Sequence, residues 1–428
     1  IQSAKVEYSY GDKVKDGKTC HGILTGVEET QPGITRSTDF FDNWTKTEVI
    51  NTYNQDLITQ YGIMKVIKSE SKIVDSFSQD GTEITQTKSV IVTYSYGDRD
   101  GYHGILTGVE ETQHGRTKSK DYFGNWTESE IRNSYKPDLI TEHGIVKIER
   151  SESEIIDSFN QDGTEITQTK SAIVTYSYGD RDGYHGILIG VEETQHGRTK
   201  SKDYFGNWTE TEVINAYNQD LVTQYGIVKI STSESKMVDS FNQDGTKVIQ
   251  TQSTIVTYSY GDKVKDRKTC HGMLTKVEET QHGRTKGTDF FDNWTETEVI
   301  NSYSQDLIRR YGIVRVAIAE SNIVDSFNQD GTKITQIQSA KVEYSYGDKI
   351  KDRRICHGIL IRVEETQPGI TRSTDFFDNW TETEVRNTYN QDLITKYGIV
   401  KVETSESEII NSFNQDGTKI TQIQSAKV

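Results

Sequence analysis

One block of sequence recurs five times along this chain, and no other feature constrains the fold as strongly. The marker "YSYGD" begins at Tyr8, Tyr94, Tyr176, Tyr258 and Tyr344, with spacings of 86, 82, 82 and 86 residues. These positions divide the chain into repeats 1 to 5, which span residues 8–93, 94–175, 176–257, 258–343 and 344–428. Because repeated units of this kind stack on their own neighbours, we predict one continuous repeat array over residues 1–428.

Each repeat also contains two related halves. In repeat 2 the first half carries "DYFGNWTESE" from Asp121, and the second carries "DSFNQDGTEIT" from Asp157. Both halves show an Asp, aromatic residues, a short polar turn, and then Thr with a β-rich run. The tryptophans all belong to the first motif, at Trp44, Trp126, Trp208, Trp294 and Trp380. We expect them to pack a core between adjacent units; the alternative is a row of aromatic sites for carbohydrate or another partner.

The apolar residues favour strands over helices. The chain has 44 Ile but only 10 Leu and 7 Ala, and β-branched residues fit pleated sheets better than helices. The segment 83–96 alternates along its length, which is typical of a half-buried strand. We therefore predict an all-β, elongated array of antiparallel hairpins, wound as a solenoid-like or spiral sheet that forms a fibre.

One segment fits a helix as well as a strand. Residues 207–226 place apolar side chains four positions apart, offer Thr209 with Glu212 as a capping box, and end at Gly226. In repeat 2, however, Pro137 falls inside the corresponding segment, where a helix interior would lose about 3 kcal/mol. We therefore predict strands throughout 126–148, with almost no helix.

Charge and motifs argue against several classes of function. The chain carries 65 acidic against 49 basic residues, which disfavours nucleic acid as a partner. No apolar run reaches the roughly 18 to 20 residues of a membrane-spanning helix. Adjacent glutamates such as Glu110 and Glu111 point to opposite faces of a strand, so we interpret them as solvated charges and not as an acid and base pair. We find no phosphate-binding or catalytic motif, and we predict that the protein is not an enzyme and needs no cofactor.

Two further sets of residues suggest modification or cross-linking. Single cysteines occur in the long loops, at Cys20, Cys270 and Cys356, without the second Cys that a zinc site or a disulfide within one repeat would need. One exposed Cys per loop suits a cross-link between chains. The "NWT" sequon recurs at Asn43, Asn125, Asn207, Asn293 and Asn379, where glycosylation competes with the interpretation that Asn only shapes a turn.

The string Asp-Tyr-Phe-Gly-Asn-Trp-Thr at 121–127 resembles the YD (Rhs-type) repeats of large bacterial surface and toxin proteins. Asp121, Gly124, Asn125 and Thr127 match the typical Tyr-Asp-x-x-Gly-Asn/Arg-Leu-Thr pattern, whereas Lys120 replaces its Tyr and Trp126 its Leu. The half-units, of about 37 and 45 residues, are also longer than the usual twenty or so. The resemblance implies long strands in successive hairpins, wound into a spiral sheet that serves as a toxin shell or a surface scaffold.

Two functions from different classes remain open. The first is a structural component of an extracellular filament or cell-surface scaffold, whose partner is the chain itself. The alternative is a repeat adhesin that binds carbohydrate or another cell, or a hollow shell around a toxin. The chain begins and ends with "IQSAKV", at 1–6 and 423–428, which is the same phase of the repeat. We therefore expect either a much longer chain or end-to-end assembly, outside the cell or at its surface.

Overall fold

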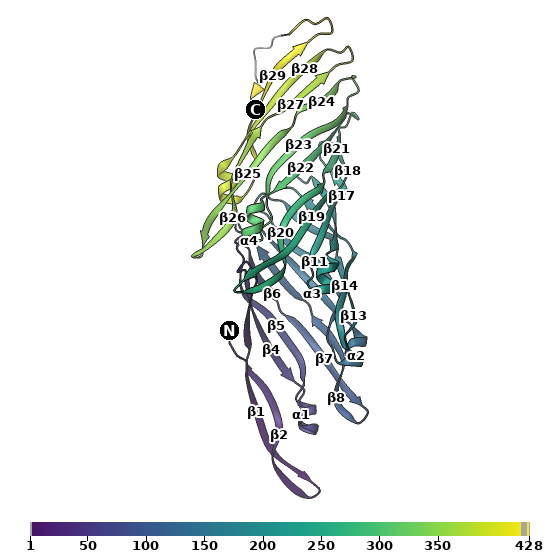
Figure 1. Ribbon diagram of the computed structural model, residues 1–428, viewed down its shortest axis with the longest axis vertical. Coiled ribbons are helices and arrows are strands. Elements are labelled where there is room, and N and C mark those ends of the chain that lie inside the picture. The colour runs from purple at the N-terminus through teal and green to yellow at the C-terminus, as the bar shows by residue number, and fades with distance from the viewer. Residues whose placement is uncertain (1, 421–425, 428) are drawn as a thin grey trace.

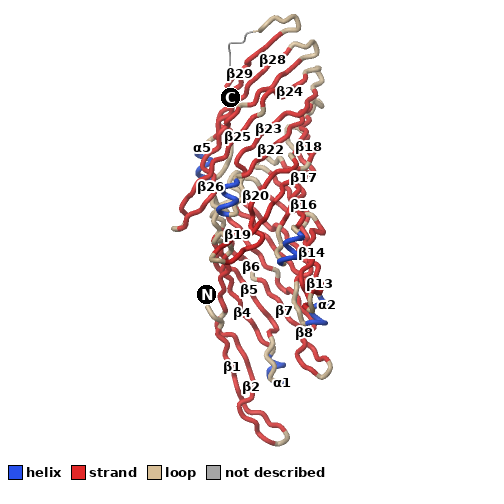
Figure 2. The backbone as a smooth tube through the Cα atoms, in the orientation of Figure 1, coloured by secondary structure: helices blue, strands red, loops and turns tan. Residues whose placement is uncertain are grey.

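The computed structural model describes residues 2–420 and 426–427 as a long, twisted β structure (Figure 1). The first hairpin lies at one end of the long axis and the last strands lie at the other. Short helices sit beside the ends of strands and not between layers of sheet (Figure 2). The prediction of an all-β fold built from repeated antiparallel hairpins is confirmed.

A long hairpin with a break in each arm opens each repeat. Between repeats 1 and 2 its first arm is β6 (Glu83–Lys88) followed by β7 (Val90–Arg99), and its second arm is β8 (Tyr102–Gln113) followed by β9 (Gly115–Lys120). β7 pairs with β8 and β6 pairs with β9, both antiparallel. The continuous strand that we predicted over 83–96 is therefore interrupted at Ser89, where its two halves pass into different sheets.

The other repeats contain the same hairpin. Its first arm is β1 (Lys5–Lys15), β12 (Glu165–Lys170) with β13 (Ala172–Arg181), β18 (Lys247–Gln252) with β19 (Thr254–Lys265), and β24 (Lys333–Gln338) with β25 (Ala340–Lys351). Its second arm is β2 (Lys18–Gln31) with β3 (Gly33–Thr38), β14 (Tyr184–Gln195) with β15 (Gly197–Lys202), β20 (Lys268–Gln281) with β21 (Gly283–Thr288), and β26 (Arg354–Gln367) with β27 (Gly369–Thr374).

Two more strands and a helix complete each repeat. The third strands are β4 (Trp44–Tyr53), β10 (Trp126–Tyr135), β16 (Trp208–Tyr217), β22 (Trp294–Tyr303) and β28 (Trp380–Tyr389). The helices are α1 (Gln55–Tyr61), α2 (Pro137–His143), α3 (Gln219–Tyr225), α4 (Gln305–Tyr311) and α5 (Gln391–Tyr397). The fourth strands are β5 (Val66–Phe77), β11 (Ile148–Phe159), β17 (Ile230–Phe241), β23 (Val316–Phe327) and β29 (Val402–Phe413); a last short strand, β30 (Ala426–Lys427), pairs with β29.

Side chains join one repeat to the next where the backbone ladder is interrupted. β11 pairs with β13 only over Arg150–Ser153. Beyond that point the Ser158 hydroxyl donates to the Ile166 carbonyl at 2.9 Å and accepts from the Ile166 N–H at 2.8 Å, which connects β11 to β12. The same serine bridge occurs at Ser76 and Ser326. Neighbouring sheets are thus held edge to edge, and the repeats follow one another laterally.

The prediction of strands throughout 126–148 is wrong between Pro137 and His143, where the chain forms α2. Pro137 is the first residue of this helix, a position that needs no N–H donor and favours the fixed φ of proline. The capping box that we considered does not form, because Thr209 and Glu212 lie in β16. Asn218 caps α3 instead, accepting from the Leu221 N–H, and Gly226 ends it in the left-handed conformation.

Each helix contributes one side chain to a narrow core. Each one buries a single aliphatic side chain, at Ile58, Ile140, Val222, Ile308 and Ile394. The helix packs against the second arm of the long hairpin of its own repeat, where Val27, Val191, Val277 and Val363 are also buried. Stability therefore depends on a few small clusters that recur once per repeat.

Half-buried tyrosines predict an alkaline limit to stability. Burial raises the pKa of Tyr260, whose hydroxyl donates to the Ile230 carbonyl at 2.7 Å, to about 12. Burial likewise raises the pKa of Tyr135, Tyr217, Tyr303 and Tyr346 to about 12. Because these folded-state values lie above the ordinary 10.0, their contribution is complete below pH 10 and is lost as the pH rises from about 10 to 12.

We expect the thermal unfolding midpoint to stay level up to about pH 9 and to fall steeply from pH 10 to 12. Ultraviolet titration of tyrosinate, with the folded chain compared with the chain in denaturant, measures the cause directly. Identical titration curves in the two states would contradict the prediction.

Candidate assembly surfaces

The "F-x-N-W" turns tie the two halves of each repeat together. In repeat 1 the Asn43 side-chain amide donates to Asp39 Oδ2 at 2.8 Å, and Asn43 Oδ1 accepts from the backbone N–H of Gln79 at 2.7 Å. The hydrogen bonds from Asn207 keep the pKa of Asp203 below its ordinary value. The same two contacts recur at all five predicted sequons: Asn43, Asn125, Asn207, Asn293 and Asn379. These bonds account for Asn as a turn residue, and glycosylation there stays a prediction.

Each predicted core tryptophan opens a third strand and spans its neighbours. Trp126 stacks on Phe159 of β11 with ring centroids 6.3 Å apart, and Lys118 of β9 places its Nζ 3.3 Å from the Trp126 ring centroid. Trp44, Trp208, Trp294 and Trp380 lie in the same way beside a Phe and a Lys or Arg. All five are half-buried. They join three strands within a repeat.

The chain curves so that repeats 4 and 5 meet repeats 1 and 2, and we call the repeats on the two sides of this contact successive turns of the chain. We call the strand ends at 39–43 and 78–82, with their counterparts in other repeats, the aromatic rim. The opposite strand ends carry the helices and the hairpin tips, at 15–18 and the corresponding residues of the other repeats. We call this side the helix rim. Lys265, at a hairpin tip of repeat 4, donates to Asp42 Oδ1 at 2.6 Å and to the Phe40 carbonyl at 2.8 Å.

Aromatic side chains fit against glycines in this contact. A Cβ on Gly312, the left-handed residue that ends α4, would lie only 2.6 Å from the ring of Phe41. Gly398 at the end of α5 meets Phe123 at the same 2.6 Å. One arrangement thus occurs twice, in which the aromatic rim of a repeat packs on the helix of the repeat three further along.

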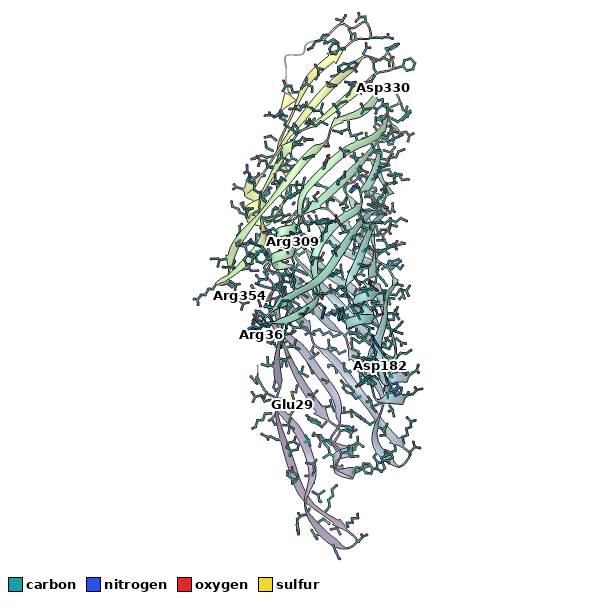
Figure 3. All side chains as sticks on the ribbon, in the orientation of Figure 1. Glu29, Arg36, Asp182, Arg309, Asp330 and Arg354 are labelled. Carbon is teal, nitrogen blue, oxygen red and sulfur yellow. The ribbon has the colours of Figure 1, made fainter. Side chains whose placement is uncertain are left out.

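Charged and backbone groups strengthen the same interface. The backbone N–H of His357 donates to the Gln79 carbonyl at 2.6 Å, and Lys351 pairs with Glu83 at 3.0 Å. Arg354 lies beside Arg36 (Figure 3), and both guanidinium groups lie within about 5 Å of the Trp44 ring centroid, at 5.1 and 4.3 Å. The helix rim is therefore basic where it meets the acidic turns of the aromatic rim.

An apolar pocket of about 590 Å³ lies beside the Phe41 contact. Phe40 and Phe41 line it from repeat 1, and Tyr217, Tyr258 and Tyr260 line it from repeats 3 and 4. The pocket lies between repeats that are far apart in the sequence, and its exposed lining is mainly apolar.

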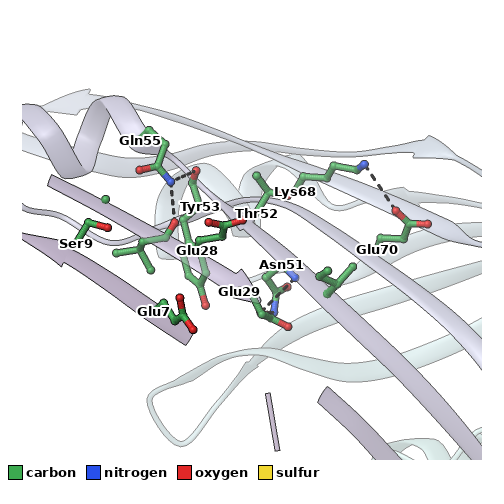
Figure 4. Close-up of a pocket in the computed structure, with 13 residues that line it drawn as sticks. Glu7, Ser9, Glu28, Glu29, Asn51, Thr52, Tyr53, Gln55, Lys68 and Glu70 are labelled. Atoms are coloured by element: carbon green, nitrogen blue, oxygen red, sulfur yellow. Dashed lines mark hydrogen bonds and ion pairs between the residues drawn. The ribbon is translucent and has the colours of Figure 1, made fainter. Parts of the chain in front are cut away.

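A second pocket, of about 580 Å³, lies between the first hairpin and β4 (Figure 4). Several of its polar groups bond to one another: Asn51 donates to Glu29 Oε2 at 3.1 Å, Gln55 donates to the Val27 carbonyl at 2.7 Å, and Lys68 pairs with Glu70. The other carboxylate oxygen, Glu29 Oε1, is buried without a hydrogen-bond partner among the described residues. Within the described residues, no group of three or more His, Cys, Asp or Glu side chains could hold a metal ion.

Buried glutamates link neighbouring strands of the fold, and the sequence analysis did not predict their burial. Glu111 and Glu193 are buried, so the prediction that both members of each glutamate pair are solvated charges is wrong for the second member. Glu111 accepts from the Asn133 side chain at 2.9 Å and lies 3.0 Å from His114 Nδ1, linking β8 to β10. The His three residues after the Glu was the available signal, and it recurs with Glu193 and Glu279.

The three cysteines occupy two different environments, and all are free thiols. Cys20 and Cys270 are partly exposed near hairpin tips, whereas Cys356 is buried under the contact between turns. Burial raises the pKa of the Cys356 thiol. A cross-link between chains stays a prediction, and Cys356 is the least accessible of the three for it.

Helix length and comparison with known proteins give two further findings. Each of the five described helices has seven residues, and none has the length and apolarity that a membrane crossing requires. No family model matches the sequence, and no curated protein matches it either.

Proposed function

We propose that this chain is a structural component of an extracellular filament or cell-surface scaffold. The observation that carries the proposal is the repeated contact between turns, Phe41 on Gly312 and Phe123 on Gly398. A contact that recurs at a fixed offset in the repeat can be continued indefinitely, because each added repeat offers the next one the same surface. The resemblance to YD repeats, which occur in large bacterial surface proteins, supports a location at the cell surface.

A repeat adhesin is the second candidate, favoured by exposed aromatic pairs. Tyr204 and Phe205 are exposed and meet edge to face with centroids 5.5 Å apart, as do Phe290 and Phe291. Such pairs offer flat apolar surfaces to a sugar ring. The loops argue for the structural role, because the five hairpin tips come in only two main forms, whereas a receptor-binding array would diversify them.

Imaging and denaturing electrophoresis of the native material test the proposal. We expect filaments in negative stain, together with either a species far above 48.6 kDa or a band at that mass which assembles end to end. Closed shells would favour a toxin enclosure. A compact particle of 48.6 kDa that does not assemble would overturn the filament function, and glycan-array binding by that particle would establish the adhesin in its place.

A further inference from the structure

The aromatic rim exists in two states within this one chain. In repeats 1 and 2 the paired aromatics at 40–41 and 122–123 are half-buried, and repeats 4 and 5 cover them. In repeats 3 to 5 the same position is bare: Tyr204 is 80% exposed, Phe290 79% and Phe376 76%. Six aromatic rings in three adjacent repeats therefore face solvent, a concentration of apolar surface that is typical of an interaction site.

The helix rim shows the reciprocal pattern. Gly312 and Gly398 end their helices with φ of +69° and are covered by Phe41 and Phe123. Gly62, Gly144 and Gly226 end theirs with φ between +66° and +71°, yet a Cβ on any of them would meet nothing within 4 Å. Three receiving surfaces of the same local shape are thus open in repeats 1 to 3.

The three exposed aromatic pairs and the three uncovered helix ends match in number and in register. Within the chain an aromatic pair packs on the helix three repeats further along. If a second molecule continues the array after repeat 5, the same offset of three repeats applies across the junction. The aromatic pairs of repeats 3, 4 and 5 then meet the helices of repeats 1, 2 and 3 of the second molecule. We propose that the aromatic rim of repeats 3 to 5 is a docking surface for the helix rim of repeats 1 to 3 of a second copy of this chain.

One pair of opposite charges fits the same occupant. Within the chain Lys351, at the end of the first hairpin arm of repeat 5, pairs with Glu83 after the Gln-Asp-Gly turn of repeat 1. Their counterparts one step on are Lys15 and Glu165, which are both exposed. In the docked pair, Lys15 of one copy faces Glu165 of the other. The interface joins two different surfaces, so it leaves one open surface at each end and propagates head to tail.

This inference rests on the filament function and adds the surfaces through which copies join. Its first test is the 428-residue chain by sedimentation velocity, with concentration raised to about 100 µM, a range in which interfaces of micromolar affinity are populated. We expect concentration-dependent, open-ended assembly. The double variant Phe290→Asp with Phe376→Asp should raise the dissociation constant about tenfold or more, because central aromatic residues dominate interface energies.

A matched control places the same two charges elsewhere. Ile189→Asp with Ile361→Asp substitutes exposed mid-strand positions away from both rims, and it should leave the dissociation constant unchanged. Circular dichroism must show the folded β spectrum for every variant. A charge exchange tests the register: Lys15→Glu should weaken assembly about two- to fivefold, and adding Glu165→Lys should restore it.

A mixing experiment tests the head-to-tail arrangement. The Phe290→Asp, Phe376→Asp variant keeps its helix rim, so it should bind one end of a growing assembly and shorten wild-type filaments in proportion to its share. Assembly by this variant at wild-type affinity would overturn the docking surface while leaving filament formation by another route intact. A wild-type chain that stays at 48.6 kDa throughout would also overturn it, and imaging of native material then decides the filament function separately.

Discussion

Ile308→Ala should lower the free energy of unfolding by about 2 to 5 kcal/mol, the usual cost of a cavity at a fully enclosed aliphatic side chain. Ile308 has 0% of its surface exposed, and it is the one buried residue of α4. The helix has only seven residues and cannot persist without this anchor. Loss of Ile308 packing should therefore release α4 from β20.

The matched control is Ile318→Ala in β23, which removes the same atoms from a side chain that is 39% exposed. It should cost below about 1 kcal/mol. Urea unfolding followed by circular dichroism gives the two midpoints, and hydrogen exchange locates the loss in α4. Equal shifts for the two variants would contradict the core that we describe.

Gly312→Ala should cost about 2 to 4 kcal/mol and should also open the contact between turns. Part of the cost, about 1 kcal/mol, arises because alanine is strained at the φ of +69°. The remainder arises because the new methyl group would lie 2.6 Å from the Phe41 ring and must displace it, as overpacking typically costs 1 to 3 kcal/mol.

Gly226→Ala separates these two causes. Gly226 ends α3 at almost the same φ, +66°, but no atom lies within 4 Å of the position of its new methyl group. It should show only the backbone cost of about 1 kcal/mol. The amide of His357, which donates across the turns to Gln79, should lose hydrogen-exchange protection in Gly312→Ala and keep it in Gly226→Ala. Protection retained in both variants would show that Phe41 does not hold the turns together.

The sequence predicted the class of fold and the location of the turns, because both follow from local patterns. It did not predict the helices. Pro137 was interpreted as a helix breaker because the helix was expected to begin several residues earlier. The seven residues of α2, which follow Lys136, are too few to show a clear helical period. The capping signals were present as Asn218 and Gly226, with Leu221 and Val222 between them. A search for short capped helices would have found them.

The contact between turns could not be predicted for a different reason. Phe41 and Gly312 are separated by three nearly identical repeats, and nothing local to either residue states which copy it meets. The curvature that brings them together is the sum of small twists at many strand pairs. The buried state of Glu111 is a mixed case: the His114 side chain three residues on was a local signal, whereas the Asn133 partner is supplied only by the neighbouring strand β10.

Contacts within a sheet are denser than contacts between turns of the chain, and this difference has a mechanical consequence. Along the sheet, β10 and β11 are paired from Trp126–Phe159 to Tyr135–Ile148 by a backbone ladder. Between turns the described contacts are isolated ones, such as Lys265 with Asp42 and Phe41 with Gly312. If copies of the chain form the filament that we propose, pulling it along its axis should separate the turns before any strand leaves its sheet. It would lengthen like an uncoiling spring and could recoil when the load was removed, with its covalent chain and its ladders intact.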